Sequence, residues 1–452
     1  MKSINPATGK LIRSYPPHTN EEANEIIGKT GEAWVDWKST DFGLRSRKMK
    51  QTATILREQN EVLAQLMTLE MGKVIHEARA EIEKCAWVCE FYADNAESFL
   101  ADEMVETNAS KSFVSFEPLG IVLAVMPWNF PFWQVFRFAA PALMAGNAAV
   151  LKHASNVPGC ALAIESIFIQ AGFPENLFRT LMISANQVEP VIMNPHIRAI
   201  TLTGSEAAGM KVASIAGRAL KKTVLELGGS DPYIVLEDAD IDKCVATAVN
   251  ARMINNGQSC IAAKRFIVVE SRLEEFETKK AEIMSTLLVG DPLLADTQVG
   301  PLARADLRDE LHEQVKASLD DGARLLLGGK SIPGPGFFYE PTVISDVRRG
   351  MSLYHEETFG PVSAIIPVKD AEQAIEVAND SEFGLGGSLW TNDLVRGEKL
   401  ARQVESGAVF VNGMTVSDPR LPFGGIKRSG YGRELSYFGI REFTNIKSIW
   451  IA

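Results

Sequence analysis

The stretch IVLAV at Ile121–Val125 is the first of four short apolar runs that decide the fold of this chain. The other three are Ala148–Leu151, Phe178–Leu181 and Ile197–Thr201, and segments with helical spacing separate them. Short buried strands that alternate with helices are typical of a parallel sheet covered by helices. The sequence therefore predicts an α/β fold.

The predicted sheet is preceded by helices and followed by a second α/β series. Between Glu21 and Asp102, apolar positions recur at helical spacing between charged ones. The strand candidates of the second series are Pro232–Leu236, Arg265–Val269, Val362–Pro367 and Gly407–Val411. Two more strand-like stretches, Lys111–Phe116 and Thr444–Ile451, lie outside both series.

Composition and charge limit the partners that this protein is expected to have. The chain has 452 residues, 46% of them hydrophobic, and a formal net charge of −11. An acidic balance argues against nucleic acid or an anionic membrane as the main partner. No apolar run reaches the ~20 residues that a membrane span needs, and the N-terminus lacks the apolar segment of a signal peptide. We therefore expect a cytoplasmic protein that binds neither nucleic acid nor membrane.

The cysteines and histidines are sparse and scattered. The five cysteines are Cys85, Cys89, Cys160, Cys244 and Cys260. An odd, widely spaced set indicates reduced thiols rather than a disulfide framework. The six histidines form none of the spacings that are typical of zinc ligands. We expect no metal site.

Three common phosphate-binding or catalytic motifs are incomplete. Leu327–Ser331 ends like a phosphate-binding loop, but Arg324 stands where that motif needs its first glycine. The GxSxG motif of α/β-hydrolases is absent. Gly384-Leu385-Gly386 begins a GxGxxG pattern but lacks its third glycine. The sequence thus disfavours a phosphotransferase, an α/β-hydrolase and an ordinary Rossmann dinucleotide grip.

Cys260 and Glu226 are candidates for chemistry, each with a structural alternative. Small and amide residues at 255–259 predict a loop before Cys260, where a backbone N–H can face a ligand. A free cysteine is more often a buried, inert side chain. Glu226 ends an apolar run and is followed by Gly228 and Gly229. It is either a buried base with a raised pKa or a glutamate bonded to the nearby turn.

The segment Pro127–Arg137 provides a third candidate. Its two prolines predict that Asn129 is the N-cap of a helix whose first turn contains Pro131. Trp133 and Arg137 then share one face of that helix. An arginine in so apolar a helix needs an anionic partner, which is either a bound ligand or an internal carboxylate.

Seven motifs occur in a fixed order along the whole chain. They are Asn5–Gly9, Pro127–Pro131, Leu202–Ser205, Glu226–Gly229, Gly257–Cys260, Glu357–Pro361 and Pro422–Gly430. Together they resemble the aldehyde dehydrogenase superfamily. The short N-terminus, Lys152–Asn156 and Ser417–Arg420 are most similar to bacterial, particularly cyanobacterial-type, members that oxidise succinic semialdehyde.

The resemblance implies an α/β architecture in three parts. A Rossmann-like cofactor domain would comprise residues 1–107 and 120–227, with part of 416–435. An α/β catalytic domain would comprise residues 228–415. Residues 108–119 and 436–452 would form a small β flap for oligomerisation, which implies a homodimer or a tetramer built from dimers.

The resemblance also implies how the reaction proceeds. Cys260 would attack the aldehyde to form a thiohemiacetal, while the Asn129 amide and the Cys260 N–H bind the oxyanion. Oxidation by NAD(P) would leave a thioester, which a water activated by Glu226 hydrolyses. For succinic semialdehyde the product is succinate. The alternatives are a broader aliphatic or ω-carboxy-aldehyde dehydrogenase, and a noncatalytic relative that keeps the fold.

Residues for cofactor and substrate follow from the same resemblance. The expected cofactor contacts are Trp128, Lys152, Ser155, Gly204, Ser205, Glu357 and Phe359. Many NAD-preferring members have a glutamate at the position of Ser155, where a carboxylate would repel the 2′-phosphate of NADP, so we expect NADP to be preferred over NAD. Arg137 and Ser417 are expected to bind the distal carboxylate, and Trp133 to line the tunnel. Ile254 stands where some members have a further arginine.

Overall fold

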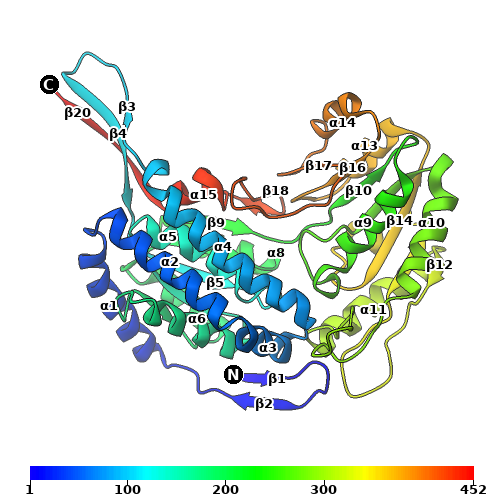
Figure 1. Ribbon diagram of the computed structural model, residues 1–452, viewed down its shortest axis with the longest axis horizontal. Coiled ribbons are helices and arrows are strands. Elements are labelled where there is room, and N and C mark those ends of the chain that lie inside the picture. The colour runs from blue at the N-terminus through cyan, green and yellow to red at the C-terminus, as the bar shows by residue number, and fades with distance from the viewer.

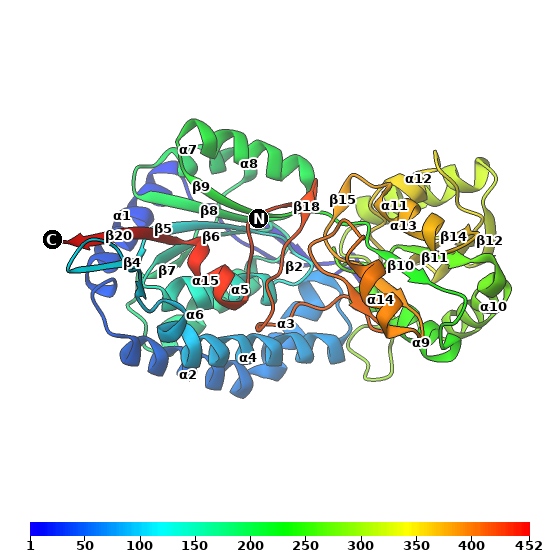
Figure 2. The ribbon, with the colours of Figure 1, turned by 90° about the horizontal axis from the view of Figure 1, so that it is seen from above.

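The computed structural model describes residues 1–452 and is built around two large, mostly parallel sheets (Figure 1). Each sheet is covered by helices, and the two halves lie next to each other in both views (Figures 1 and 2). The predicted α/β fold is confirmed. Hydrogen bonds that join the halves lie at the candidate site, which is described below.

The first sheet has the strand order β19-β9-β8-β5-β6-β7. Its strands are β5 (Ile121–Met126), β6 (Ala148–His153), β7 (Phe178–Thr180), β8 (Ile197–Thr203), β9 (Lys222–Glu226) and β19 (Gly430–Tyr431). All neighbours are parallel except β19, which is antiparallel to β9. The four apolar runs quoted first thus form β5 to β8. Their side chains are mostly buried on both faces, as expected for strands of a parallel sheet that helices cover.

Helices cover both faces of this sheet. They are α1 (Asn20–Trp37), α2 (Phe42–Glu58), α3 (Asn60–Met71), α4 (Ile75–Phe99), α5 (Trp133–Met144), α6 (Pro158–Gln170), η1 (Ala185–Gln187), α7 (Val188–Met193) and α8 (Glu206–Arg218). Figure 2 shows α7 and α8 on one face of the sheet and α2 and α4 on the other. The buried side chains of α4 recur every three or four residues, as predicted for this region.

The second sheet has the strand order β12-β13-β14-β11-β10-β16-β17. Its strands are β10 (Pro232–Val235), β11 (Arg265–Val269), β12 (Arg324–Leu327), β13 (Thr342–Ser345), β14 (Val362–Val368), β16 (Ser388–Trp390) and β17 (Phe410–Val411). The helices around it are α9 (Ile241–Met253), η2 (Ile254–Gly257), α10 (Glu270–Ser285), α11 (Ala305–Asp320), α12 (Ser352–His355), α13 (Ala371–Asn379) and α14 (Leu394–Ala401). Only β12 runs antiparallel to its neighbour.

One strand of the second sheet is shorter than predicted. The sequence suggests a strand over Gly407–Val411, but β17 begins only at Phe410. The Gly407 N–H donates to the carbonyls of Gly384 and Leu385, at 3.1 Å each. A Cβ at this glycine would lie 1.7 Å from the Gly424 carbonyl oxygen. Gly407 therefore packs into a loop junction rather than into the sheet.

The remaining strands form three small sheets. They are β1 (Lys2–Ile4) with β2 (Leu11–Ser14), β15 (Phe383–Gly384) with β18 (Ile426–Lys427), and β20 (Thr444–Ile451) with β4 (Lys111–Pro118) and β3 (Glu103–Met104). The last of these extends away from the body of the molecule, beyond α15 (Ser436–Glu442) (Figure 1). None of the helices combines the length and apolar character required to cross a lipid bilayer.

The topology of the first sheet defines one edge as a binding position. The chain passes from β5 to β6 and β7 on one side, and then crosses over to β8 and β9 on the other. The strand order thus reverses between β5 and β8. In open parallel sheets, ligands bind outside the carboxyl ends of the strands at such a reversal.

Candidate active site

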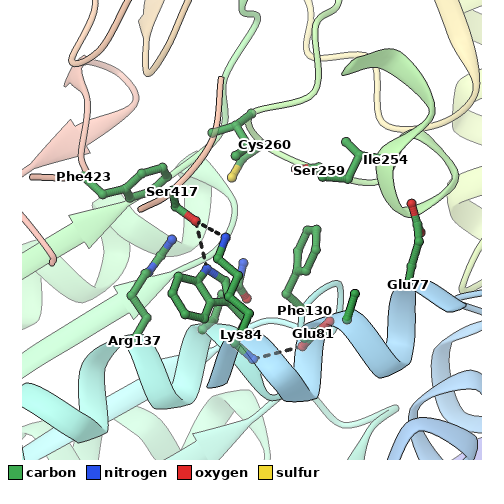
Figure 3. Close-up of a pocket in the computed structure, with 14 residues that line it drawn as sticks. Glu77, Glu81, Lys84, Phe130, Arg137, Ile254, Ser259, Cys260, Ser417 and Phe423 are labelled. Carbon is green, nitrogen blue, oxygen red and sulfur yellow. Dashed lines mark hydrogen bonds between the residues drawn. The ribbon is translucent and has the colours of Figure 1, made fainter. Parts of the chain in front are cut away.

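A cavity of about 210 Å³ lies where the two halves of the molecule meet (Figure 3). Its walls come from α4, from α5 and the turn before it, and from the loop that contains Cys260; Ser417 and Phe423 complete it. Figure 3 shows Cys260 entering from one side, while Lys84 and Arg137 rise from helices on the other. The structure thus brings together four of the predicted residues: Cys260, Arg137, Trp133 and Ser417.

Cys260 lies in the loop between η2 and β11, and side-chain amides fix the loop's shape. Asn255 and Asn256 have φ values of 52° and 56°, in the left-handed region that asparagine tolerates better than most residues. The Asn255 amide donates to the carbonyls of Asn129 and Gln258, at 2.7 and 3.0 Å. Both carboxylate oxygens of Glu77 accept from the Asn255 N–H, at 3.1 and 3.0 Å. The loop is therefore held from both halves of the molecule.

Cys260 differs from the other four cysteines. It is partly exposed in the cavity, whereas Cys85, Cys89, Cys160 and Cys244 are all buried. Burial raises the pKa of the Cys260 thiol to about 12, and the nearby Lys264 and Arg137 charges oppose this effect. The Lys264 ammonium donates to the Cys260 carbonyl at 2.7 Å. The resting thiol is thus protonated and needs a base to become a nucleophile.

The prediction that Asn129 caps the following helix is wrong. Helix α5 begins only at Trp133, and its first N–H groups are bound by the Glu81 carboxylate, which accepts from Phe132 and Trp133 at 2.9 Å each. The Asn129 amide instead donates to the Gln258 carbonyl at 3.0 Å. Asn129 lies too far before α5 to cap it, and its side chain points toward the cysteine loop.

Glu226 is the last residue of β9 and is 2% exposed. Neither of its carboxylate oxygens has a hydrogen-bond partner among the protein's groups, so the alternative of a glutamate bonded to a turn does not apply. Burial and the negative charge of Glu434 raise the pKa of Glu226 well above its usual value, against the opposing charges of Arg137 and Arg433. This environment favours the protonated form of the Glu226 carboxyl more strongly than water would.

Arg137 has an internal partner. Its guanidinium forms an ion pair with Glu434, and both side chains are almost fully buried. The guanidinium carbon also lies 4.5 Å from the centre of the Phe423 ring. Of the two alternatives that the sequence left open, the structure thus has an internal carboxylate. Sequence analysis missed Glu434 because nothing local distinguishes it among the chain's 57 acidic residues.

Sequence analysis also missed Lys84, which lines the same cavity. Its ammonium donates to the Ser417 hydroxyl at 2.8 Å and lies 4.2 Å from the centre of the Trp133 ring. The Trp133 indole N–H donates to the same hydroxyl at 3.1 Å. Burial and the charge of Arg137 lower the pKa of Lys84 to about 8. A single lysine in a long helix gives no local sequence signal for such a position.

The predicted cofactor residues gather mainly along the carboxyl edge of the first sheet. Trp128 follows β5, Ser155 follows β6, and Gly204 and Ser205 follow β8. The Ser205 hydroxyl caps α8 by accepting from the Ala208 N–H at 3.4 Å. Lys152, near the end of β6, is partly buried, and burial lowers the pKa of its ammonium. An ammonium, an exposed hydroxyl and a helix N-terminus are a donor set that fits the phosphates of a nucleotide.

The two remaining predicted cofactor residues come from the second half of the molecule. Phe359 contacts Trp128 edge-on, with the ring centres 5.8 Å apart. The Glu357 carboxylate accepts from the Gly229 N–H at 3.0 Å and pairs with Lys264 at 3.2 Å. No cluster of three or more His, Cys, Asp or Glu side chains is arranged to hold a metal ion.

Comparison with known proteins identifies the class. The model of the aldehyde dehydrogenase family matches residues 1–449, and the chain belongs to this family. A probable NADP(+) succinate-semialdehyde dehydrogenase of Synechocystis is 53% identical over 450 residues, which are 100% of this chain and 99% of that protein. The NADP(+) succinate-semialdehyde dehydrogenase of Mycobacterium avium is 50% identical over 453 residues, covering 99% of this chain and 96% of its own.

A solved structure agrees in fold over the whole chain. The succinic semialdehyde dehydrogenase of Streptococcus pyogenes, crystallised with NADP+, has a TM-score of 0.98 and 38% sequence identity. The match covers 100% of this chain and 99% of that one. The aldehyde dehydrogenase-like fold expected from the sequence is thus confirmed.

Proposed function

We propose that this protein oxidises succinic semialdehyde to succinate, with NADP as the preferred cofactor. The observation that carries the proposal is one cavity that contains the partly exposed Cys260 thiol together with Arg137 and Ser417. Arg137 is paired with Glu434, but its guanidinium and the Ser417 hydroxyl still offer N–H and O–H donors to the distal carboxylate of an aldehyde bound at Cys260. The names of the similar dehydrogenases point to the same substrate and cofactor.

The chemistry begins with attack on the aldehyde carbon. The sulfur of Cys260 forms the bond to the carbonyl carbon, and the thiol proton passes through water to the former carbonyl oxygen, which gives a thiohemiacetal. The Asn129 amide and the Cys260 N–H donate to the developing oxyanion, and one such donor is typically worth ~3–4 kcal/mol. The Asn129 amide has a second N–H for this purpose besides the one that binds Gln258.

The second half of the reaction releases the acid. A bound nicotinamide cofactor would supply the acceptor for the hydride of the thiohemiacetal carbon; with loss of the hydroxyl proton to water, a thioester would remain on Cys260. Glu226, once deprotonated, takes a proton from a water that attacks the thioester carbonyl. The C–S bond then breaks, and the carboxylic acid leaves while the thiol is restored.

The cofactor preference rests on Lys152 and Ser155. Both lie at the end of β6, where the exposed Ser155 hydroxyl brings no negative charge to the edge of the sheet. A 2′-phosphate would gain charge-assisted hydrogen bonds from the lysine and the hydroxyl. NAD, which lacks this phosphate, would bind more weakly.

We also propose that the protein assembles through the sheet formed by β3, β4 and β20. The exposed apolar side chains of this sheet are Met104, Ile446, Trp450 and Ile451, and Val105, directly after β3, is exposed as well. A second copy that covers this sheet would give a homodimer, and two dimers a tetramer. The division into a cofactor domain, a catalytic domain and this flap belongs to the same proposal.

A substrate panel tests the function. Succinic semialdehyde, a longer ω-carboxy-aldehyde and butanal are each combined with NADP and with NAD, and the reduced nicotinamide is followed by its absorbance. We expect the highest kcat/KM with succinic semialdehyde and NADP, and no activity in Cys260→Ser. Equal kcat/KM for butanal would contradict the proposal and favour a broader aldehyde dehydrogenase.

A further inference from the structure

Two cations line the cavity, and only one of them has a carboxylate partner. Arg137 is paired with Glu434, so its charge is already compensated inside the protein. Lys84 forms no ion pair. Its contacts are the Ser417 hydroxyl at 2.8 Å and the Trp133 ring at 4.2 Å. Lys84 is therefore the cation that is free to pair with an anion entering the cavity.

The acidic residues near Lys84 are engaged elsewhere. On its own helix, Glu81 is paired with the buried Lys73 and binds the start of α5. Glu77 binds the N–H of Asn255. In the loop after β17, Asp418 is paired with Arg420 at 2.6 Å. Burial, and after it the positive charge of Arg137 on α5, disfavours protonation of Lys84 in the absence of an anion.

The hydrogen bonds at Ser417 leave only donors facing an incoming ligand. A serine hydroxyl has one hydrogen to donate and two lone pairs to accept with. Lys84 and the Trp133 indole both donate to this oxygen, at 2.8 and 3.1 Å, and thereby occupy both lone pairs. The hydroxyl hydrogen is then left for an acceptor outside this trio. The ammonium has three N–H groups, of which Ser417 uses one.

We propose that Lys84 is the residue that determines specificity for a carboxylate at the far end of the substrate, and that it acts together with the Ser417 hydroxyl. This inference deepens the proposed function and rests on it. Trp133 holds both donors in place before the substrate arrives, through its indole N–H and its ring face. Some family members have an arginine at the position of Ile254. In this protein Lys84, from α4, would provide the positive charge that this arginine provides there.

Kinetics on charged and uncharged substrates test this assignment. Lys84→Met is compared with the unaltered protein on succinic semialdehyde and on butanal, which has the same number of carbons and no carboxylate. We expect kcat/KM for succinic semialdehyde to fall roughly 10- to 100-fold, mainly through KM, as for the loss of a charge-assisted hydrogen bond. The value for butanal should change less than about threefold, which also shows that the variant is folded.

Two matched variants sharpen the result. Lys84→Arg keeps the charge and should retain most of the preference for succinic semialdehyde. Arg79→Met removes a cation from the exposed face of the same helix, outside the cavity. It should leave kcat/KM unchanged for both substrates. Raising the pH through 8 should increase KM for succinic semialdehyde in the unaltered protein as Lys84 loses its proton, but not in Lys84→Arg.

The outcomes separate this inference from the proposed function. If the unaltered protein prefers succinic semialdehyde and Lys84→Met keeps that preference unchanged, the assignment of Lys84 is wrong while the proposed function stands. If the unaltered protein itself shows no preference over butanal, the proposed function fails, and the role of Lys84 fails with it.

Discussion

Glu434 lies in the same buried region as Glu226, and its negative charge opposes the ionisation of Glu226. Burial raises the pKa of Glu226 most, and the negative charge of Glu434 raises it further. The positive charge of Arg137, which is paired with Glu434, works in the opposite direction. Both carboxyls are almost fully buried, at 2% and 4% exposed. Only the deprotonated Glu226 carboxyl can take a proton from water, and its raised pKa disfavours that form. Hydrolysis of the thioester should thus become faster as the pH rises.

Glu226→Gln should stop the reaction after the thioester has formed. A carboxamide cannot take a proton from water, so we expect steady-state turnover to fall roughly 100-fold or more. The first turnover should remain as a burst of about one reduced nicotinamide per Cys260. Stopped-flow absorbance measures the burst, and mass spectrometry of the quenched protein detects the acyl group. Unchanged turnover without an acylated protein would contradict this role for Glu226.

Ser155→Glu should reverse the cofactor preference. A carboxylate at this position repels a 2′-phosphate and can accept hydrogen bonds from ribose hydroxyls instead. We expect the ratio of kcat/KM for NADP to that for NAD to fall by roughly 10- to 100-fold. Ser155→Ala is the matched control, since it removes the hydroxyl without adding a charge and should weaken NADP without improving NAD. A ratio that stays the same in Ser155→Glu would exclude this role.

Glu77 should make stability depend on pH in a defined direction. Burial raises its pKa from 4.5 to about 7, so between these values the folded protein holds a proton that the unfolded chain releases. The resulting stabilisation is fully present below pH 4.5 and is lost as the pH rises through 7. Glu77→Gln lacks this titration and still accepts from the Asn255 N–H. Between pH 5 and pH 8, the unaltered protein should lose roughly 1–3 kcal/mol more stability than the variant.

Urea unfolding at the two pH values measures this difference. The midpoint of the unaltered protein should decrease relative to that of Glu77→Gln as the pH is raised. If the two urea midpoints changed equally between the two pH values, Glu77 would titrate in its usual range.

Lys73 and Glu81 form a buried ion pair. Removing one member of the pair should destabilise the protein more than removing both. Lys73 is fully buried and Glu81 is 5% exposed. Lys73→Met leaves the Glu81 charge unpaired and should cost about 3–5 kcal/mol of stability. The double variant Lys73→Met/Glu81→Gln should be less unstable than Lys73→Met alone, because no buried charge remains. Thermal unfolding of the unaltered protein and the two variants checks this order, and a double variant less stable than Lys73→Met would contradict it.

Local pattern in the sequence was sufficient for ten of the twenty strands. The runs that became β5, β6, β7 and β8 are short and mostly apolar, so strands could be predicted there, with bounds correct to within two residues. The N-cap prediction for Asn129 was wrong because the side chain of a good N-cap residue can also bind elsewhere. Here the Asn129 amide donates to the Gln258 carbonyl. The acceptor that binds the start of α5 comes instead from Glu81, on another helix.

The partners of charged side chains could not be predicted, for a different reason. The need of Arg137 for an anion follows from its apolar surroundings, but the identity of Glu434 depends on how β19 and the following turn pack against β9. Lys84 meets Ser417 across a large sequence separation as well. Long-range pairs of this kind arise from tertiary packing, which single-sequence periodicity does not encode.

Helix α4 presents Glu77, Glu81 and Lys84 on one face, since residues three and four apart are neighbours on a helix. These side chains contact the cysteine loop, the start of α5 and Ser417, respectively. Exchanging α4 for that of a relative, in order to change the substrate range, would affect all three contacts at once. It would alter the position of the cysteine loop, the start of α5 and the substrate specificity together. Recombination breakpoints placed at the ends of α4 should accordingly yield functional hybrids more often than breakpoints inside it.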